Sequence, residues 1–275
     1  MVERYNLSAE FGDPGVIGSP NETETWGTNG PQVEPGPKYY SPSNQWRLLA
    51  VDDLDTNSPG CESVWKNVHN GLAVVRRNPD TLRAPSSDMP GEASPMPEVM
   101  VGTGQLLLSD RNAELLVQEP ISQQLWILSS NFRRTLLPIM LMPSERPVGV
   151  ADFNGDGIDD LVVQQIHNGQ YQIWKLSVDG STTSSVPTLA EIYAIVPAKP
   201  VDPGWNLASV GEFDGSGSPD LLWINQGTGK AAVWLMEWTP QGLVRKAGGI
   251  TSIDLGAAPT SKDIHTRRWR IAAPN

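Results

Sequence analysis

The sequence predicts an all-β protein, and three observations lead to this prediction. Short apolar runs rich in valine, too short for helices, alternate with turn-forming residues along the chain. The 275 residues include 26 glycines and 24 prolines, which suits a fold that needs many tight turns. No run of apolar residues has the length and spacing of an amphipathic helix.

The stretch Val148–Leu176 contains the clearest structural unit of the chain. Two short apolar runs flank an acidic loop that is bent by Gly157. The second run leads to the pair Asn168-Gly169, which is typical of a hairpin turn because both residues tolerate positive φ. An alternating segment then ends at Leu176. The unit therefore predicts strand, acidic loop, strand, tight turn and strand.

The same pattern recurs over residues 46–75, 101–128 and 205–236. In each copy one acid opens the second strand, and these acids are 52, 46 and 60 residues apart: Glu62, Glu114, Asp160 and Asp220. A fourth strand is expected in the apolar stretches behind three of the copies: Leu136–Met142, Ile192–Val196 and Ile250–Leu255. Four strands at this period are typical of the blades of a β-propeller.

The acidic loops place side-chain oxygens at alternate positions, where they can converge on one point. A Ca²⁺ ion is enclosed in this way by six to eight oxygens, with a backbone carbonyl among them. The candidate ligands in the three loops are Asp152, Asn154, Asp156, Ile158 and Asp160; Glu212, Asp214, Ser216, Ser218 and Asp220; and Asp53, Asp55, Asn57 and Glu62. The ions are expected to be structural, because each would hold together a turn whose charges otherwise repel.

The loops differ in their expected affinity for calcium. The loop that begins at Asp152 has the most complete set of oxygens, so it is expected to bind most tightly. The loop at Glu212 opens with a longer acid and has the neutral Ser216, which weakens it. The loop at Asp53 has an extra residue before Glu62. The loop Ser109–Asn112 in the remaining copy is too short to enclose an ion.

The segments DFNGDGIDDLVV and FDGSGSPDLLWINQGTGKAAVWLM resemble the FG-GAP (VCBS-type) repeat family, which also forms the heads of integrin α-subunits. The resemblance covers about residues 45 to 275. It implies a β-propeller of calcium-binding blades. The family is functionally broad, so the resemblance implies no reaction.

The sequence predicts two regions. Residues 1–44 form an N-terminal extension, with one strand over Tyr5–Phe11 and then a coil rich in glycine and proline; residues 45–275 form the propeller. Trp269–Ala273 repeats the pattern of Trp46–Ala50, the first strand of a unit. We therefore expect four repeats and a fifth blade that both termini close. The alternative is an open ring that a partner chain or a second copy completes.

Composition and motifs narrow the function classes. The net charge of −11 argues against nucleic acid as a partner, because the chain has no basic stripe to neutralise phosphates. The single cysteine, Cys61, cannot form an internal disulfide. No apolar stretch has the length of a membrane span, and the first residues lack the pattern of a signal peptide. Weak calcium sites suit a calcium-rich compartment, so an extracellular or cell-surface location is expected, with the periplasm as the alternative.

The sequence favours a non-enzymatic, calcium-stabilised module that binds a protein or glycan partner, as an oligomer or as a subunit of a larger extracellular assembly. His69 and His167 occupy the same turn in two copies, which is better explained by turn chemistry than by catalysis. No hydrolase or phosphate-binding motif occurs. A carbohydrate-binding lectin is the first alternative. A hydrolase or lyase that uses a propeller face is the less favoured one.

Overall fold

A computed structural model describes residues 46–57, 61–67, 69–76, 94–107, 112–178, 186–200, 202 and 204–254. These residues form sixteen β-strands and no helix, so the all-β prediction is confirmed. In this part of the chain there is accordingly no helix that could cross a membrane. The N-terminal extension 1–44, the strand expected over Tyr5–Phe11, the segment Trp269–Ala273 and most of the Ser109–Asn112 loop lie outside the described residues.

The strands fall into four consecutive units of four. The first unit contains β1 (Trp46–Asp52), β2 (Glu62–Asn67), β3 (Leu72–Arg76) and β4 (Ser94–Pro95). The second contains β5 (Val99–Gly104), β6 (Glu114–Gln118), β7 (Leu125–Leu128) and β8 (Arg134–Leu137). The third contains β9 (Glu145–Ala151), β10 (Asp160–Gln165), β11 (Gln170–Ser177) and β12 (Thr188–Val196). The fourth contains β13 (Trp205–Gly211), β14 (Asp220–Asn225), β15 (Lys230–Thr239) and β16 (Gly242–Asp254).

Each unit is an antiparallel meander in which every strand pairs with the next along the chain. The first and second units are separate four-stranded sheets. The third and fourth are joined into one eight-stranded sheet, because β12 pairs in parallel with the start of β16 at Ala194 and Gly242. The two edge strands of this sheet, β9 and β13, contact each other, so the sheet is nearly closed.

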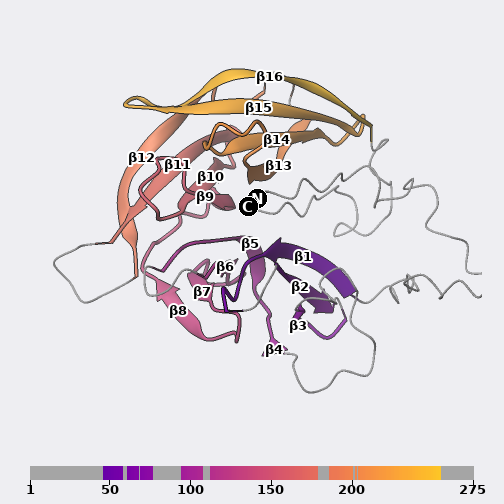
Figure 1. The fold of residues 1–275 in the computed structure, drawn as a ribbon, viewed down its shortest axis with the longest axis vertical. Coiled ribbons are helices and arrows are strands. Elements are labelled where there is room, and N and C mark those ends of the chain that lie inside the picture. The colour runs from indigo at the N-terminus through magenta and orange to yellow at the C-terminus, as the bar shows by residue number, and fades with distance from the viewer. Residues whose placement is uncertain are drawn as a thin grey trace, which may run out of the picture.

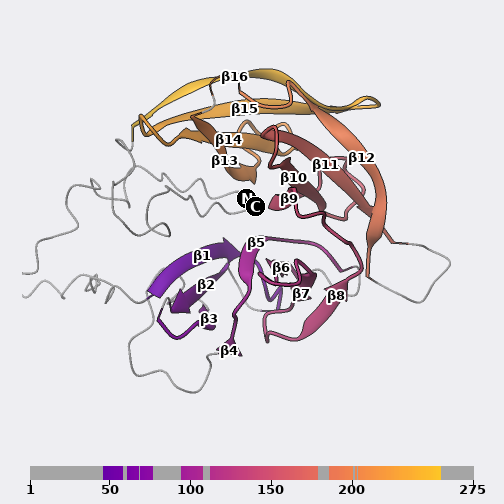
Figure 2. The same cartoon turned by 180° about the vertical axis from the view of Figure 1, so that it is seen from behind.

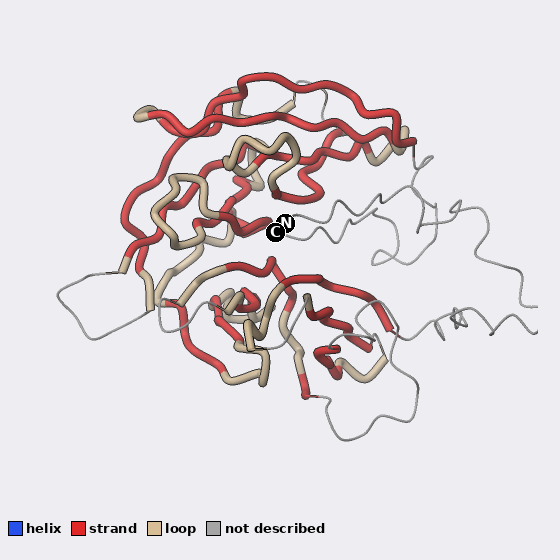
Figure 3. The backbone as a smooth tube through the Cα atoms, viewed as in Figure 1, coloured by secondary structure: helices blue, strands red, loops and turns tan. Residues whose placement is uncertain are grey.

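The units are arranged around a common centre (Figure 1). Their first strands β1, β5, β9 and β13 lie innermost, and the last strands β8, β12 and β16 lie on the outside, as the view from behind also shows (Figure 2). Contacts between β1 and β5, between β5 and β9 and between β9 and β13 place the inner strands side by side. The backbone trace shows that loops and turns connect the strands at the two ends of each unit (Figure 3).

A β-bulge occurs at the same place in the first strand of every unit. The residues that it leaves without a partner in the ladder are Leu49, Val101, Val148 and Ala208. Each lies 12 or 13 residues before the acid that opens the second strand. A bulge bends a strand and increases its twist. All four units are therefore bent in the same way near the centre.

The hydrophobic core lies between neighbouring units. On β10, Leu161 and Val163 face the second unit, whereas Val162 faces the fourth. Alternate residues of one strand point to opposite faces, so a strand with neighbours on both sides is apolar throughout. This explains why the second strand of each unit is almost wholly buried. The clusters between the third and fourth units also contain Trp223 and Trp234.

The predicted strands agree with the structure where the pattern was strongest. All four second strands begin at the predicted acid. The expected fourth strands occur as β8, β12 and β16, although β8 ends at Leu137 because Pro138 has no N–H to donate to a ladder. The sequence pattern predicted no strand at residues 94–95. They form the short β4, which pairs with Leu72 and Ala73.

Replacement of Ile173 by alanine is expected to lower the free energy of unfolding by about 2 to 5 kcal/mol, because this side chain is fully buried between the third and fourth units. Ile192→Ala on the neighbouring β12 is the matched control, since 48% of that residue is exposed. It should cost less than about 1 kcal/mol. Urea denaturation of both variants measures the difference, and equal losses would contradict a core between the units.

Candidate metal centre

The acid that opens each second strand is almost completely buried. The exposed fraction of these residues does not exceed 2%: Glu62, Glu114, Asp160 and Asp220. A buried carboxylate is stable only when its oxygens receive hydrogen bonds. The source of these hydrogen bonds therefore determines how each loop must fold.

In the third and fourth units the buried acid bonds to the third strand. The Oδ1 atom of Asp160 accepts a hydrogen bond from the Leu176 amide at 2.9 Å, and Asp220 Oδ1 accepts one from the Met236 amide at 2.8 Å. Both amides lie at a register shift, between residues 175 and 176 and between residues 235 and 236. The irregularity turns an amide away from the ladder, and the carboxylate receives it.

In the first and second units the buried acid is glutamate, and it bonds to its own loop. Glu62 Oε2 accepts hydrogen bonds from the amides of Leu54 at 2.9 Å and Asp55 at 3.1 Å. Glu114 Oε2 accepts the corresponding bonds from Leu106 and Leu107, at the same two distances. The two glutamates thus hold their loops through the same pair of backbone hydrogen bonds.

The loop between β13 and β14 brings three carboxylates together. One oxygen each of Glu212, Asp214 and Asp220 lies within 4.8 Å of the other two, and this is the only such acidic group in the described part of the chain. Glu212 is held in place by the amides of Asp214, Gly215 and Gly217, at 3.0, 2.7 and 2.7 Å. Glu212 and Asp214 are exposed, whereas Asp220 is buried.

The charges of this group are only partly balanced. Burial raises the pKa of Asp220, and the nearby charges of Asp214 and Glu212 raise it further. Hydrogen bonds from Ser216 lower the pKa of Asp214, and Lys246 adds to this effect. No ion pair in the described part of the chain involves any of the three acids. A cation that binds here would relieve their mutual repulsion.

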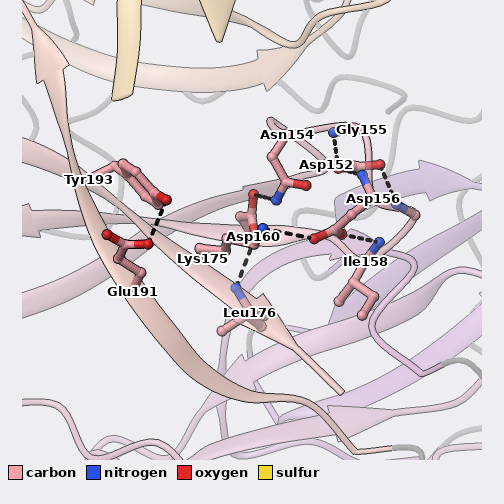
Figure 4. A network of polar contacts seen from close by, with 11 residues as sticks. Asp152, Asn154, Gly155, Asp156, Ile158, Asp160, Lys175, Leu176, Glu191 and Tyr193 are labelled. Atoms are coloured by element: carbon pink, nitrogen blue, oxygen red, sulfur yellow. Dashed lines mark hydrogen bonds and ion pairs between the residues drawn. The ribbon is translucent and has the colours of Figure 1, made fainter. Parts of the chain in front are cut away.

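The loop between β9 and β10 has the same backbone form. Positive φ values occur at Gly155 and Gly157, as they do at Gly215 and Gly217. Asp152 takes the place of Glu212: it accepts hydrogen bonds from the amides of residues 155, 156 and 157 at 2.8, 3.2 and 2.8 Å. Figure 4 shows these contacts around the loop.

The polar groups of the Asp152 loop bond mainly to one another. Asn154 Nδ2 donates to Asp160 Oδ2 at 2.9 Å, and Lys175 Nζ lies 3.3 Å from Asp156 Oδ2 (Figure 4). Burial raises the pKa of Asp160 to about 7. Sequence reasoning ranked this loop first because it has the most side-chain oxygens. Among the described residues, three acids converge within 4.8 Å only in the Glu212 loop.

The other candidate ligands have clear positions. Ile158 is buried in the core between the second and third units, and its amide donates to Asp156 Oδ1 at 3.1 Å. The Ser218 amide donates to Ser216 Oγ at 3.3 Å. Each residue anchors the end of its loop.

The loop at Asp53 is tied to the second unit. The amide and the hydroxyl of Thr56 both donate to Asn112 Oδ1 at 2.8 Å, and the Asn57 amide donates to Asp55 Oδ1 at 3.2 Å. Glu62 Oε1 is buried and accepts no hydrogen bond from the described residues. The acids of this loop do not meet the 4.8 Å spacing that the described residues of the Glu212 loop show.

Asp159 is a buried acid whose burial could not be predicted from the sequence. It is 8% exposed, and its Oδ2 accepts a hydrogen bond from the Gln105 amide at 2.9 Å. The side chain lies against Gly104, where an added Cβ would be 1.8 Å from Oδ2. Burial raises the pKa of Asp159 to about 7. The sequence pattern did not single it out, and only the structure shows its contact with the end of β5.

Comparison with known proteins gives no match: no family model, no curated protein and no solved structure is similar to the chain. Functional inference therefore depends on the geometry of the loops and on the exposed surface.

Removal of the Asp159 charge is expected to change the pH dependence of stability. Because the folded pKa of about 7 lies above the ordinary 3.8, the folded state holds a proton that the unfolded state has lost between these values. Stability conferred by that proton is lost as the pH rises toward 7. In EDTA, the free energy of unfolding of the natural chain should fall by about 3 kcal/mol more than that of Asp159→Asn between pH 5 and pH 8.

Urea denaturation at several pH values measures this difference. Glu237→Gln removes an exposed carboxylate on β15 and serves as the control. Its pH profile should match that of the natural chain. Parallel profiles for Asp159→Asn and the natural chain would contradict the assignment.

Proposed function

We propose that the chain is a calcium-stabilised β-propeller of the FG-GAP (VCBS) type that acts as a non-enzymatic binding module for a protein partner. The observation that carries the calcium assignment is the approach of Glu212, Asp214 and Asp220 to within 4.8 Å of one another. Three carboxylates supply the hard oxygen ligands that Ca²⁺ requires. Ser216 and backbone carbonyls of the loop can complete the shell.

Calcium loops of extracellular modules bind with dissociation constants of about 10⁻⁴ to 10⁻³ M. The loop at Glu212 has a neutral serine at one ligand place, which is consistent with this weak range. An ion would be bound only where calcium is abundant. We therefore infer an extracellular or cell-surface location, or the periplasm.

The propeller assignment is supported by the four meanders around one centre (Figure 1). Two faces of this arrangement have no described neighbour. On the fourth unit, Leu222, Ile224 and Ala231 point away from the third unit. On the first unit, Trp65 and Val74 are buried, but they are not part of the core that this unit shares with the second unit.

A fifth blade between the first and fourth units would cover both faces. Trp269–Ala273 has the pattern of β1, and Tyr5–Phe11 alternates like a strand. We infer that these two segments belong to this blade and close the ring. A partner chain or a second copy is the alternative, and it would bury the same two faces.

Exposed aliphatic side chains favour a protein partner. Ile121 and Met140 are each 92% exposed, and Met142 and Ile166 are also exposed. Ile121 and Ile166 lie in turns between second and third strands, and the two methionines lie in the link from β8 to β9. The Ile166 amide donates to the Ser144 carbonyl at 2.7 Å, which joins the turn to the link.

These connections lie at the opposite end of the units from the metal loops, because successive connections of a meander alternate between its two ends. We call Ile121, Met140, Met142 and Ile166 the apolar rim. Large apolar side chains that gather on one face are typical of protein-binding surfaces. Most described tryptophans are instead at least half-buried, which makes stacking on sugars, and hence a lectin, the second choice.

The alternatives make different predictions for binding. A lectin would bind immobilised glycans directly, and a hydrolase or lyase would turn over a substrate. A subunit of a larger extracellular assembly would form a stable complex through the apolar rim or through the two faces that have no described neighbour. Each of these outcomes can be separated from calcium binding, because the metal loops lie at the other end of the units.

Calcium at 10 mM is expected to raise the melting temperature by about 3 to 10 °C, the shift that corresponds to the weak affinity range. Asp214→Asn should remove most of this shift. Asp156→Asn should remove less, because Asp156 already has Lys175 as a partner. Differential scanning calorimetry with calcium, with magnesium and with EDTA makes the measurement; no shift in the natural chain would exclude structural calcium.

A photo-crosslinking residue placed at position 140 is expected to capture a protein when the calcium-loaded chain is returned to its native source. The same residue at position 250 is the matched control, since Ile250 is exposed on β16, away from the apolar rim. Capture at position 140 and not at position 250 supports the proposal, provided that Ile166→Glu weakens this capture. Equal capture at both positions, or binding to glycans without a crosslink, counts against it.

A further inference from the structure

The two similar loops differ at one position on the third strand. Leu176 and Met236 are equivalent, because each donates its amide to the buried aspartate that lies 16 residues before it. The residues immediately before them are therefore also equivalent, and both lie at the register shift of their strand. One is Lys175 and the other is Leu235.

Lys175 directs its charge into the Asp152 loop. Its Nζ atom lies 3.3 Å from Asp156 Oδ2, and the two side chains are only 28% and 33% exposed. Figure 4 shows the lysine extending from β11 toward the loop, next to Asp160. The equivalent position of the fourth unit has the uncharged Leu235. Lys246 of β16 lowers the pKa of Asp214, but it forms no ion pair with the acids of this loop in the described part of the chain.

The side-chain amide of Asn154 is a second group that offsets negative charge in the Asp152 loop. In the Asp152 loop it donates to the buried Asp160, while the equivalent residue in the other loop is Asp214, which has no proton to donate. Asp214 instead contributes a third negative charge near Asp220. The Asp152 loop thus has an ion-paired lysine and an amide that donates to its buried aspartate. Among the described residues, the Glu212 loop has neither of these contacts; Ser216 and the more distant Lys246 act there on Asp214 alone.

We propose that Lys175 is the built-in cation of the Asp152 loop and that it excludes a divalent ion from this loop. The inference rests on the proposed calcium binding by the Glu212 loop. Of two loops with the same backbone form, one has an ion pair with a lysine of the third strand, and the other would receive its cation from solution. The position that distinguishes the two loops lies outside both of them. It is residue 175 or 235 of the third strand, immediately before the residue whose amide donates to the buried aspartate.

Electrostatic repulsion gives the size of the effect. An ammonium group about 4 Å from a divalent ion repels it even in bulk water, which weakens binding by about tenfold or more. Against the millimolar affinity expected of these loops, such a penalty leaves the site empty. Removal of the charge should restore it.

The experiment measures calcium binding to the full chain by isothermal titration calorimetry. Lys175→Leu copies the fourth unit, Lys175→Arg keeps the charge, and Leu235→Lys transfers the charge to the other loop. The natural chain and Lys175→Arg should bind one ion, and Lys175→Leu should bind two. Leu235→Lys should lose at least tenfold in affinity for its single ion.

A double variant assigns the new site to its loop. Lys175→Leu with Asp214→Asn should bind one ion through the Asp152 loop, and a further Asp156→Asn change should abolish it. Circular dichroism checks that each variant is folded. A folded Lys175→Leu that binds no more calcium than Lys175→Arg overturns the inference, and so does a natural chain that binds two ions.

Failure of the proposed function gives a different result. If the natural chain binds no calcium, the assignment of the Glu212 loop is wrong. The inference about Lys175 is then decided by Lys175→Leu alone: one ion gained supports it, and none overturns it.

Discussion

The structure depends on a buried carboxylate at the first residue of the second strand in each unit. Glu62, Glu114, Asp160 and Asp220 are almost completely buried, and a buried acid without hydrogen bonds would be very costly. Backbone amides are the donors in every unit. Because the donors come from the loop or from the third strand, each acid fixes the path of the chain around it. The acid is therefore part of the fold before it is part of any metal site.

The length of the acid determines which amides it uses. A glutamate extends far enough to receive two amides of the preceding loop, as Glu62 and Glu114 do. An aspartate is shorter, and in the third and fourth units one oxygen bonds to an amide at an irregularity of the third strand. The aspartate units thus hold the loop and the third strand close together. This places residues 175 and 235 beside the loop, so a charge at either position acts on the acids of the loop.

Much of the fold could be predicted from the periodicity of the sequence and the composition of its loops. The start of each second strand could be predicted because an acid, an apolar run and a tight turn recur in a fixed order. The short β4 could not, since Ser94 and Pro95 have no strand pattern and pair only because β3 is beside them. The parallel pairing of β12 with β16 was also hidden. It requires Gly242, where any Cβ would come within 2.4 Å of the Ala194 carbonyl.

The sequence predicted which residues form the candidate sites. It did not predict which charges and donors from elsewhere in the fold act on them. Counting oxygens ranked the Asp152 loop above the Glu212 loop, because a count treats each loop as isolated. Lys175 is 19 residues from Asp156 in sequence, and no spacing rule connects them. The amide of Asn154 is equally ambiguous, because it can supply an oxygen to an ion or a proton to Asp160. Tertiary contacts decide both questions.

The third and fourth units differ in what surrounds their acidic loops. The third unit has described neighbours on both faces, so packing and internal charges stabilise its loop. Among the described units, the fourth shares a core with the third on one face, and its other face has the small buried cluster of Leu222, Ile224 and Ala231. Its loop brings Glu212, Asp214 and Asp220 within 4.8 Å of one another, and repulsion among these acids opposes folding unless a proton or a cation offsets it. Under the proposed calcium binding, an ion at this loop would therefore stabilise the fourth unit.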